Sequence, residues 1–275
     1  MTLSQSEETA LIGLVRDVAR AEILPRFRRL EPTEIRAKSR ADDLVTAADI
    51  AAERALTEGV ARILPAAQVV GEEAVAADAG VLDRVGAAGR VVIIDPVDGT
   101  WNFAKGLAVF GVILAVVEDG ETVFGLLYDP VFDDWVVARK GAGAFLGRAG
   151  AAPVPLSLGH AVPLAEAQGF VPLFLYPEAE RAGIAAAMLD VGRGGSLRCS
   201  CHEYRQIVTG GADFGLNALL NVWDHAAGAL AVTEAGGCAA LEDGRTYRPE
   251  MREGRLAVAS SGSLWRALTD RFGRA

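Results

Sequence analysis

Acidic side chains stand at the ends of several predicted strands and helices, where the fold could bring them to one place. Glu72 and Glu73 follow one short predicted strand, and a second, strongly apolar strand is followed by Asp95 and Asp98. Asp224 stands at the start of a predicted helix. Carboxylate oxygens are preferred ligands of hard divalent cations such as Mg²⁺ or Mn²⁺. Because carboxylates at one point repel each other unless a cation neutralises them, this pattern indicates a metal site suited to a phosphate ester.

The segment that carries Asp95 and Asp98 is predicted to be a tight turn. Pro96 would set the turn and Gly99 would let the backbone approach closely, so that both carboxylates face one point. If a helix starts near Thr100, the amides of Gly99 and Thr100 point at an anion, and the helix dipole favours its binding. Strand, acidic turn and helix start would then form a cradle for phosphate and metal.

Each of these acids also has a purely structural interpretation. The acidic turn is ordinary turn chemistry when taken alone. Thr46 and Asp49 have the spacing of a capping box, so Asp49 could serve only to cap a helix. Glu72 and Glu73 could be a solvated pair, and Asp224 could be a helix N-cap. Taken one at a time, each acid favours the structural interpretation, and the metal site is predicted from the whole set.

The apolar pattern predicts a layered α/β (α+β) fold. An antiparallel block in the first half is followed by strands that alternate with helices, which indicates layered helices and sheets. The boundary between an N-terminal lobe, 1–150, and a C-terminal lobe, 151–275, is expected near Gly150. Helices are predicted over an N-terminal segment that ends at Pro25 and over 46–64, 177–189, 203–209, 224–234 and 264–271. Strands are predicted at 69–70, 91–94, 110–118, 122–128, 135–138, 141–146, 170–175, 196–200 and 214–220, with two more before the last helix.

Composition excludes several classes of protein. The chain has 275 residues, 51% of them hydrophobic and 23% charged, which is typical of a globular protein. A net charge of -9 argues against nucleic acid or an anionic membrane as a partner, although bound cations would still admit an anionic substrate. The longest apolar run, Leu107 to Val117, is too short to span a bilayer. Cys199, Cys201 and Cys238 lack the spacing of a disulfide framework or zinc site, and a cytoplasmic location is expected.

Taken together, the motifs resemble those of the inositol monophosphatase-like, metal-dependent phosphatases. The matching segments occur in the family's order between Lys38 and Gly237. They are Lys38, Asp43-Leu44-Val45-Thr46-Ala47-Ala48-Asp49, Gly71-Glu72-Glu73, Asp95-Pro96-Val97-Asp98-Gly99-Thr100-Trp101-Asn102-Phe103, Trp223-Asp224-His225-Ala226-Ala227-Gly228 and Glu234-Ala235-Gly236-Gly237. The resemblance implies an α-β-α-β-α sandwich, a homodimer, inhibition by Li⁺, and hydrolysis of a small phosphorylated metabolite.

The resemblance also implies a role for each matching residue. Two or three Mg²⁺ ions, or Mn²⁺, would be ligated by Glu72, Asp95, Asp98, Asp224 and the carbonyl of Val97. Asp49 and Thr100 would form a hydrogen-bonded pair that activates a metal-bound water, with Glu72 as a third catalytic group. The substrate would be bound by Asp98, Gly99, Thr100, Ser200, Asn217 and Asp224. We expect in-line attack by water without a phosphoenzyme.

Two departures from the family pattern leave the substrate open. Asn217 stands where inositol-selective members carry a glutamate, and the segment from Arg198 to Tyr204 also differs. Arg198, Ser200 and His202 are candidate specificity residues, although for His202 a structural hydrogen bond is the favoured interpretation. Inositol monophosphate is therefore one candidate substrate, beside histidinol phosphate, sugar phosphates and 3′(2′),5′-bisphosphate nucleotides.

Three other functions are less well supported. A catalytically silent binding or regulatory protein would most simply have lost a ligand or the pair formed by Thr100 and Asp49, and neither is lost. The glycines between Gly141 and Gly147 lack the spacing of a dinucleotide-binding loop. A serine hydrolase would need a G-x-S-x-G elbow, which the sequence does not contain.

Overall fold

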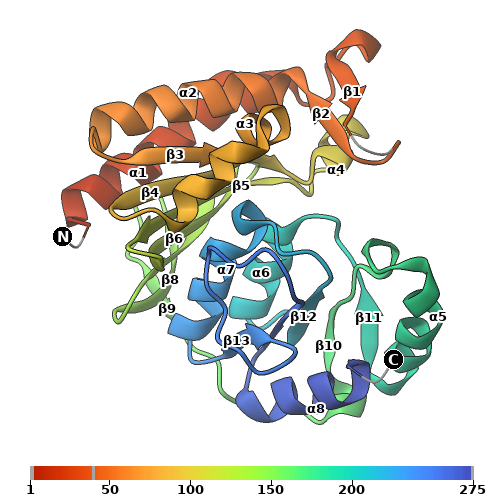
Figure 1. Cartoon of the computed structure of the whole chain (residues 1–275). Helices are drawn as coiled ribbons and strands as arrows, with labels where there is room; N and C mark the ends of the chain where they lie inside the picture. The colour runs from red at the N-terminus through yellow and green to blue at the C-terminus, as the bar shows by residue number, and fades with distance from the viewer. Residues whose placement is uncertain (1–2, 39–40, 274–275) are drawn as a thin grey trace.

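The computed structural model describes residues 3–38 and 41–273, and these residues form five layers (Figure 1). Two helices cover one face of a large sheet, two lie between this sheet and a smaller one, and two cover the outer face of the smaller sheet. In that order the pairs are α1 (Gln5–Val18) with α2 (Ala47–Ile63), α6 (Ser200–Val208) with α7 (Val222–Glu234), and α5 (Glu178–Ala187) with α8 (Gly262–Phe272). The predicted α-β-α-β-α sandwich is confirmed.

The large sheet has seven strands in chain order, antiparallel except for the parallel pair of β3 and β4. Its strands are β3 (Gln68–Gly71), β4 (Arg90–Asp98), β5 (Gly111–Glu118), β6 (Glu121–Asp129), β7 (Asp134–Arg139), β8 (Gly143–Arg148) and β9 (Val154–Leu156). The smaller sheet has the order β11-β10-β12-β14-β13. Its strands are β10 (Gln168–Phe170), β11 (Arg193–Gly195), β12 (Phe214–Asn217), β13 (Cys238–Leu241) and β14 (Leu256–Ala259).

Three short elements complete the region around the acidic residues. They are the hairpin of β1 (Ile35–Ala37) and β2 (Leu44–Thr46), helix α3 (Glu72–Ala77) and helix α4 (Thr100–Ala104). The hairpin and α3 were not predicted from the sequence, whereas a helix start near Thr100 was expected. None of the helices in the described ranges combines the length and apolar character that crossing a bilayer requires.

Side chains of β4 alternate between two cores. Val91 and Ile93 pack toward α6 and α7, and Val92 and Ile94 pack toward α1 and α2. This period of two explains why the strand is apolar throughout, because helices cover both of its faces. The alternation also decides which way the acids at its end point.

Two predicted strands are wrong. The predicted strand 170–175 ends at Phe170, because Pro172 interrupts it and a 3₁₀ turn, Leu173–Leu175, follows. The predicted strand 196–200 lies beyond β11, and Ser200 already begins α6. The start of α6 is held by a carboxylate from β4, a contact that the local sequence does not reveal.

Asp133, in the turn between β6 and β7, ties α1 to the large sheet. Its carboxylate accepts hydrogen bonds from Arg16 at 2.7 and 2.8 Å, Arg20 at 2.6 Å and Tyr128 at 2.9 Å. The bond from Arg16 is the main reason why the pKa of Asp133 lies well below its ordinary value. These bonds therefore stabilise the fold at a pH above the unfolded pKa of about 3.9 and lose effect as the pH falls through the lowered folded value.

We predict that Asp133→Asn lowers the free energy of unfolding by about 2 kcal/mol at pH 7, because charge-assisted hydrogen bonds are lost. The difference from the wild type should begin to shrink below about pH 3.9, where the carboxylate of the unfolded chain takes up a proton, and should largely vanish only as the pH falls through the lowered folded value. Urea unfolding at pH 7 and at pH 2 measures both quantities. An equal deficit at the two pH values would contradict the assigned role of the charge.

Candidate active site

A β-bulge places Asp95 and Asp98 on the same face of β4. Asp95 pairs with Ile113 of β5, but Asp98 pairs with Gly111, so β4 advances three residues while β5 advances two. In a regular strand, residues three apart point to opposite faces, and the extra residue reverses this. Val97 accordingly packs toward α1 and α2, away from both acids. The predicted tight turn is wrong, because β4 continues through Asp98, but its consequence for the two carboxylates holds.

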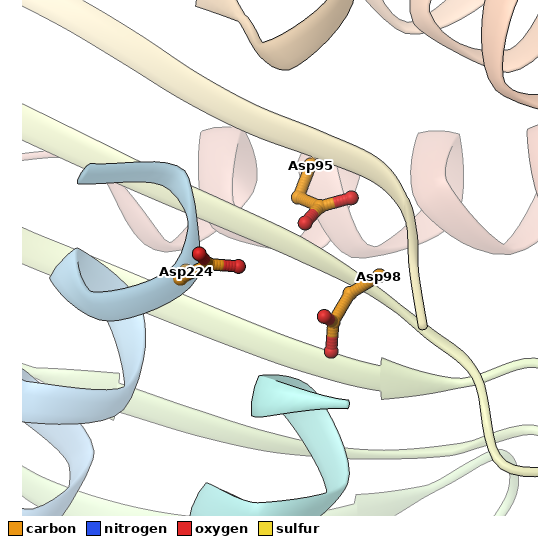
Figure 2. Close-up of side chains that lie close together, drawn as sticks. All are labelled: Asp95, Asp98 and Asp224. Carbon is orange, nitrogen blue, oxygen red and sulfur yellow. The ribbon is translucent and has the colours of Figure 1, made fainter. Parts of the chain in front are cut away.

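Three carboxylates from β4 and α7 converge beside the bulge (Figure 2). One oxygen from each of Asp95, Asp98 and Asp224 lies within 4.8 Å of the other two. Asp95 Oδ1 is buried and has no hydrogen-bond partner in the described part of the chain. Burying a carboxylate oxygen without a partner costs free energy of folding. Hard oxygen donors in this arrangement are suited to bind a divalent cation.

The pKa values reflect the cost of bringing these acids together. Burial and then the charges of Glu72 and Asp98 raise the pKa of Asp95 well above its ordinary value. Burial and the charge of Asp224 raise the pKa of Asp98 to about 8, and burial raises that of Asp224 to about 6. A cation would reverse this effect by favouring the ionised forms.

Lys38 holds the two acids that begin α3. Its Nζ lies 2.8 Å from Glu72 Oε1 and 2.6 Å from Glu73 Oε1. Their side chains are only 19% and 13% exposed, so the alternative of a solvated pair is wrong. Burial raises the pKa of Glu72 to about 7 despite the opposing effect of Lys38. Glu72 stands outside the group of three aspartates, but its charge is felt by Asp95.

Glu53, which the sequence analysis did not identify, fixes the start of α3. Its carboxylate oxygens accept hydrogen bonds from the backbone amides of Glu73 and Ala74, both at 2.8 Å. This approach requires a glycine at position 71, since a Cβ on Gly71 would lie 2.2 Å from Glu53 Cδ. Glu53 thus anchors the backbone of α3 while Lys38 holds its side chains. The glycine before the acid pair was the only signal in the sequence.

Asp49 has both of the roles considered from the sequence. Its Oδ2 accepts hydrogen bonds from the Thr46 amide at 2.8 Å and the Thr46 hydroxyl at 2.5 Å, which completes the capping box of α2. Its Oδ1 lies 3.1 Å from the Thr100 hydroxyl, which also lies 3.0 Å from the Val97 carbonyl oxygen. Burial raises the pKa of Asp49 to about 6, against the opposing hydrogen bonds from Thr46.

The segment before α6 packs against the site and holds Asp98. Asp98 Oδ2 accepts hydrogen bonds from the Cys201 amide at 2.5 Å and the Cys199 thiol at 3.0 Å. A hydrogen bond from the Ser200 side chain favours the ionised form of Asp224. Both cysteines are buried, as expected, but Cys199 also donates to a site residue, which the sequence analysis missed.

Gly99 joins β4 to α4 and lies close to Cys199 in the segment before α6. Its φ of 84° lies in the left-handed region, and a Cβ there would lie 2.8 Å from the Val109 carbonyl oxygen and 3.1 Å from Cys199 Cβ. Only glycine satisfies both conditions without strain. Gly99 therefore permits α4 to begin at Thr100, close to the bulge.

Three other expected residues lie in different settings. Asn217 ends β12, and its amide donates to the Leu256 carbonyl at 3.4 Å, with no described contact to the three aspartates. His202 Nε2 lies 3.0 Å from the Phe110 carbonyl oxygen, which agrees with the structural interpretation. Asp224 is in the first turn of α7, but Asn221 is the N-cap, so the interpretation of Asp224 as the cap is wrong.

Comparisons with known proteins agree with this arrangement. The model of the inositol monophosphatase family matches residues 4–273. The chain is 28% identical over 246 residues to an inositol-1-monophosphatase of Bacillus subtilis, covering 88% of each chain. It is 30% identical over 270 residues to a histidinol-phosphatase of Streptomyces coelicolor, covering 94% of each. The structure of an IMPase from Thermotoga maritima shares the fold, with a TM-score of 0.81, 98% coverage of both chains and 24% identity. With the family match over nearly its whole length, the chain belongs to the inositol monophosphatase family.

Proposed function

We propose that this protein is a phosphatase that depends on a divalent cation and hydrolyses a small phosphorylated metabolite by in-line attack of water. The observation that carries the proposal is the convergence of Asp95, Asp98 and Asp224, with a buried oxygen of Asp95 that lacks a partner. The names of the relatives, inositol-1-monophosphatase and histidinol-phosphatase, support the same class of reaction.

The cation would be held by these three aspartates, together with Glu72 and the carbonyl of Val97. All five offer oxygen, which suits Mg²⁺ or Mn²⁺ better than a softer metal. When bound, two or three such ions would supply Lewis-acid activation of water and neutralise charge on the phosphate. Lys38 would keep the Glu72 side chain in place, since it already holds it at 2.8 Å.

Thr100 and Asp49 would handle the proton of the attacking water. The Thr100 hydroxyl lies within hydrogen-bonding distance of both Asp49 Oδ1 and the Val97 carbonyl oxygen, and with its hydrogen directed toward Asp49 its oxygen would be free to accept a proton from water. With a pKa of about 6, Asp49 is mostly ionised at neutral pH and able to receive that proton through Thr100. The capping bonds from Thr46 would fix the orientation of the Asp49 carboxylate.

The amides of Gly99 and Thr100 would hold the phosphate oxygens, and four side chains would contact the rest of the substrate. These are Asp98, Ser200, Asn217 and Asp224. Because the transition state of phosphoryl transfer is largely loose, positioning and charge neutralisation would supply most of the rate enhancement. Inositol monophosphate, histidinol phosphate, sugar phosphates and bisphosphate nucleotides are all compatible with this arrangement. A homodimer and inhibition by Li⁺ stay predictions of the family resemblance, and a cytoplasmic location stays a prediction from the cysteine pattern.

Metal removal tests the proposal directly. Treatment with EDTA should abolish phosphate release from a panel of small phosphomonoesters, and Mg²⁺ should restore it in a saturable manner. Li⁺ should then inhibit the restored activity. Mg²⁺ should also raise the melting temperature, because a ligand that binds only the folded state stabilises it. Full activity in EDTA, or a metal titration without effect on either quantity, would refute the proposal.

A further inference from the structure

An arginine in a strained backbone conformation lies between the two segments that form the site. Arg198 has a φ of 54°, in the left-handed region that disfavours residues with a side chain. A residue other than glycine is disfavoured in this conformation because its Cβ crowds the backbone. Backbone strain of this kind concentrates where a side chain serves a function, so the Arg198 side chain calls for an explanation.

The Arg198 side chain reaches across to the start of α4. Its guanidinium carbon lies 4.3 Å from the centroid of the Trp101 ring, at a distance typical of cation–π stacking. Trp101 directly follows Thr100, and Arg198 directly precedes Cys199, whose thiol donates to Asp98. The stacked pair is therefore attached on both sides to residues of the candidate active site.

Most N–H groups of the Arg198 guanidinium make no hydrogen bond within the described part of the chain. Only Nη2 has a hydrogen-bond partner among the described residues, namely Asp42, at 3.5 Å from the carbonyl and 3.4 Å from the carboxylate. The two side chains are 43% and 47% exposed, and an exposed ion pair of this length contributes little to stability. Nε and Nη1 of Arg198 make no hydrogen bond within the described ranges. The contact with Trp101 thus positions a planar donor whose remaining N–H groups have no hydrogen-bond partner among the described residues.

We propose that Arg198 is a specificity-determining residue that binds a second anionic group, a carboxylate or a phosphate, on the leaving part of the substrate. This inference rests on the proposed phosphatase function and narrows its substrate class. A guanidinium held over an aromatic ring is suited to paired hydrogen bonds with such a group. Lysine would keep the charge but lose the fork-like geometry.

The test compares substrates that differ only in the second anionic group. One pair is 3-phosphoglycerate and glycerol 3-phosphate, and the other is fructose 1,6-bisphosphate and fructose 6-phosphate. In Arg198→Gly, the ratio of kcat/KM within at least one pair should fall by about tenfold, the loss expected for one charge-assisted interaction. The pair that responds identifies the group as carboxylate or phosphate. Arg198→Lys should give an intermediate ratio.

Glycine is the informative substitution because it relieves the strain at this φ, so the variant should fold at least as stably as the wild type. Arg28→Gly is a matched control, since Arg28 also has a positive φ, 59°, and stacks on an aromatic ring, Phe27. A thermal melt checks the folding of both variants. If Arg198→Gly keeps both ratios while the wild type shows Mg²⁺-dependent release, the role of Arg198 is wrong and the proposed function stands.

Binding gives a second measurement that does not require turnover. Tryptophan fluorescence, with Trp101 beneath the guanidinium, should respond to 3-phosphoglycerate or fructose 1,6-bisphosphate in the presence of Mg²⁺. Arg198→Gly should raise the Kd by about tenfold for whichever ligand the arginine recognises. Equal Kd values in wild type and variant for both ligands would overturn the assignment, even if the chain released no phosphate.

Discussion

Asp95→Asn should lower the rate of phosphate release by about 10³-fold, since one of the three converging carboxylates loses its charge while its shape is kept. Asparagine offers one neutral oxygen where the wild type offers a charged pair, so the affinity for a divalent cation falls as well. Initial rates across a Mg²⁺ titration separate the loss of maximal rate from the weaker activation. Wild-type rates in the variant would reject Asp95 as a member of the metal site.

The same substitution should make the metal-free protein more stable. In the wild type, Asp95 Oδ1 is buried without a partner, and neighbouring acids oppose its ionisation. Asparagine does not ionise, so this cost of folding is lost and the melting temperature in EDTA should rise by about 2–4 °C, which corresponds to about 1 kcal/mol. The rise in melting temperature caused by Mg²⁺ should largely disappear. Asp270→Asn, at an exposed position on α8, is a control that should change neither quantity.

Lys38→Met should destabilise the fold by about 3 kcal/mol, the largest loss of stability that we predict. Lys38 is the cation that both Glu72 and Glu73 contact, and all three side chains are less than 20% exposed. Without the ammonium group, two neighbouring carboxylates stay half-buried and repel each other. Urea unfolding in EDTA at pH 7 measures the change without a contribution from bound metal.

A triple variant distinguishes this charge effect from simple loss of packing. Lys38→Met combined with Glu72→Gln and Glu73→Gln removes the cation and both carboxylates, so much of the lost stability should return. The triple variant should nevertheless release no phosphate, because Glu72 belongs to the proposed metal site. If the triple variant were no more stable than Lys38→Met alone, charge burial would not be the cause.

Local patterns predicted the elements that carry the site, because the relevant signals lie close together in the chain. The spacing of Thr46 and Asp49 predicted the start of α2, and the apolar run before Asp95 predicted β4. The structural and functional interpretations of Asp49 competed in the sequence but are compatible in the structure. Each oxygen of its carboxylate serves one of them.

Contacts between distant segments could not be predicted in the same way. The bulge in β4 depends on the register with β5, which no local pattern encodes. Glu53 lies 20 residues before Glu73 in the chain, and only the packing of α2 beside α3 brings its carboxylate to the α3 backbone. The start of α6 at Ser200 was mistaken for a strand, because its cap, the Asp98 carboxylate, comes from the opposite half of the chain. Sequence reasoning thus found the acids and the cap that holds Asp49, but not Glu53 or the contacts of the α6 segment with Asp98.

The offset in β4 has a consequence for how this gene tolerates change. Between Asp95 and Asp98 the chain contributes a carbonyl group and a spacing, both of which many amino acids could supply. Loss or gain of a single codon there would turn Asp98 toward α1 and α2 and away from Asp224. Retention of the activity through evolution therefore depends more strictly on the number of residues in this stretch than on their identity.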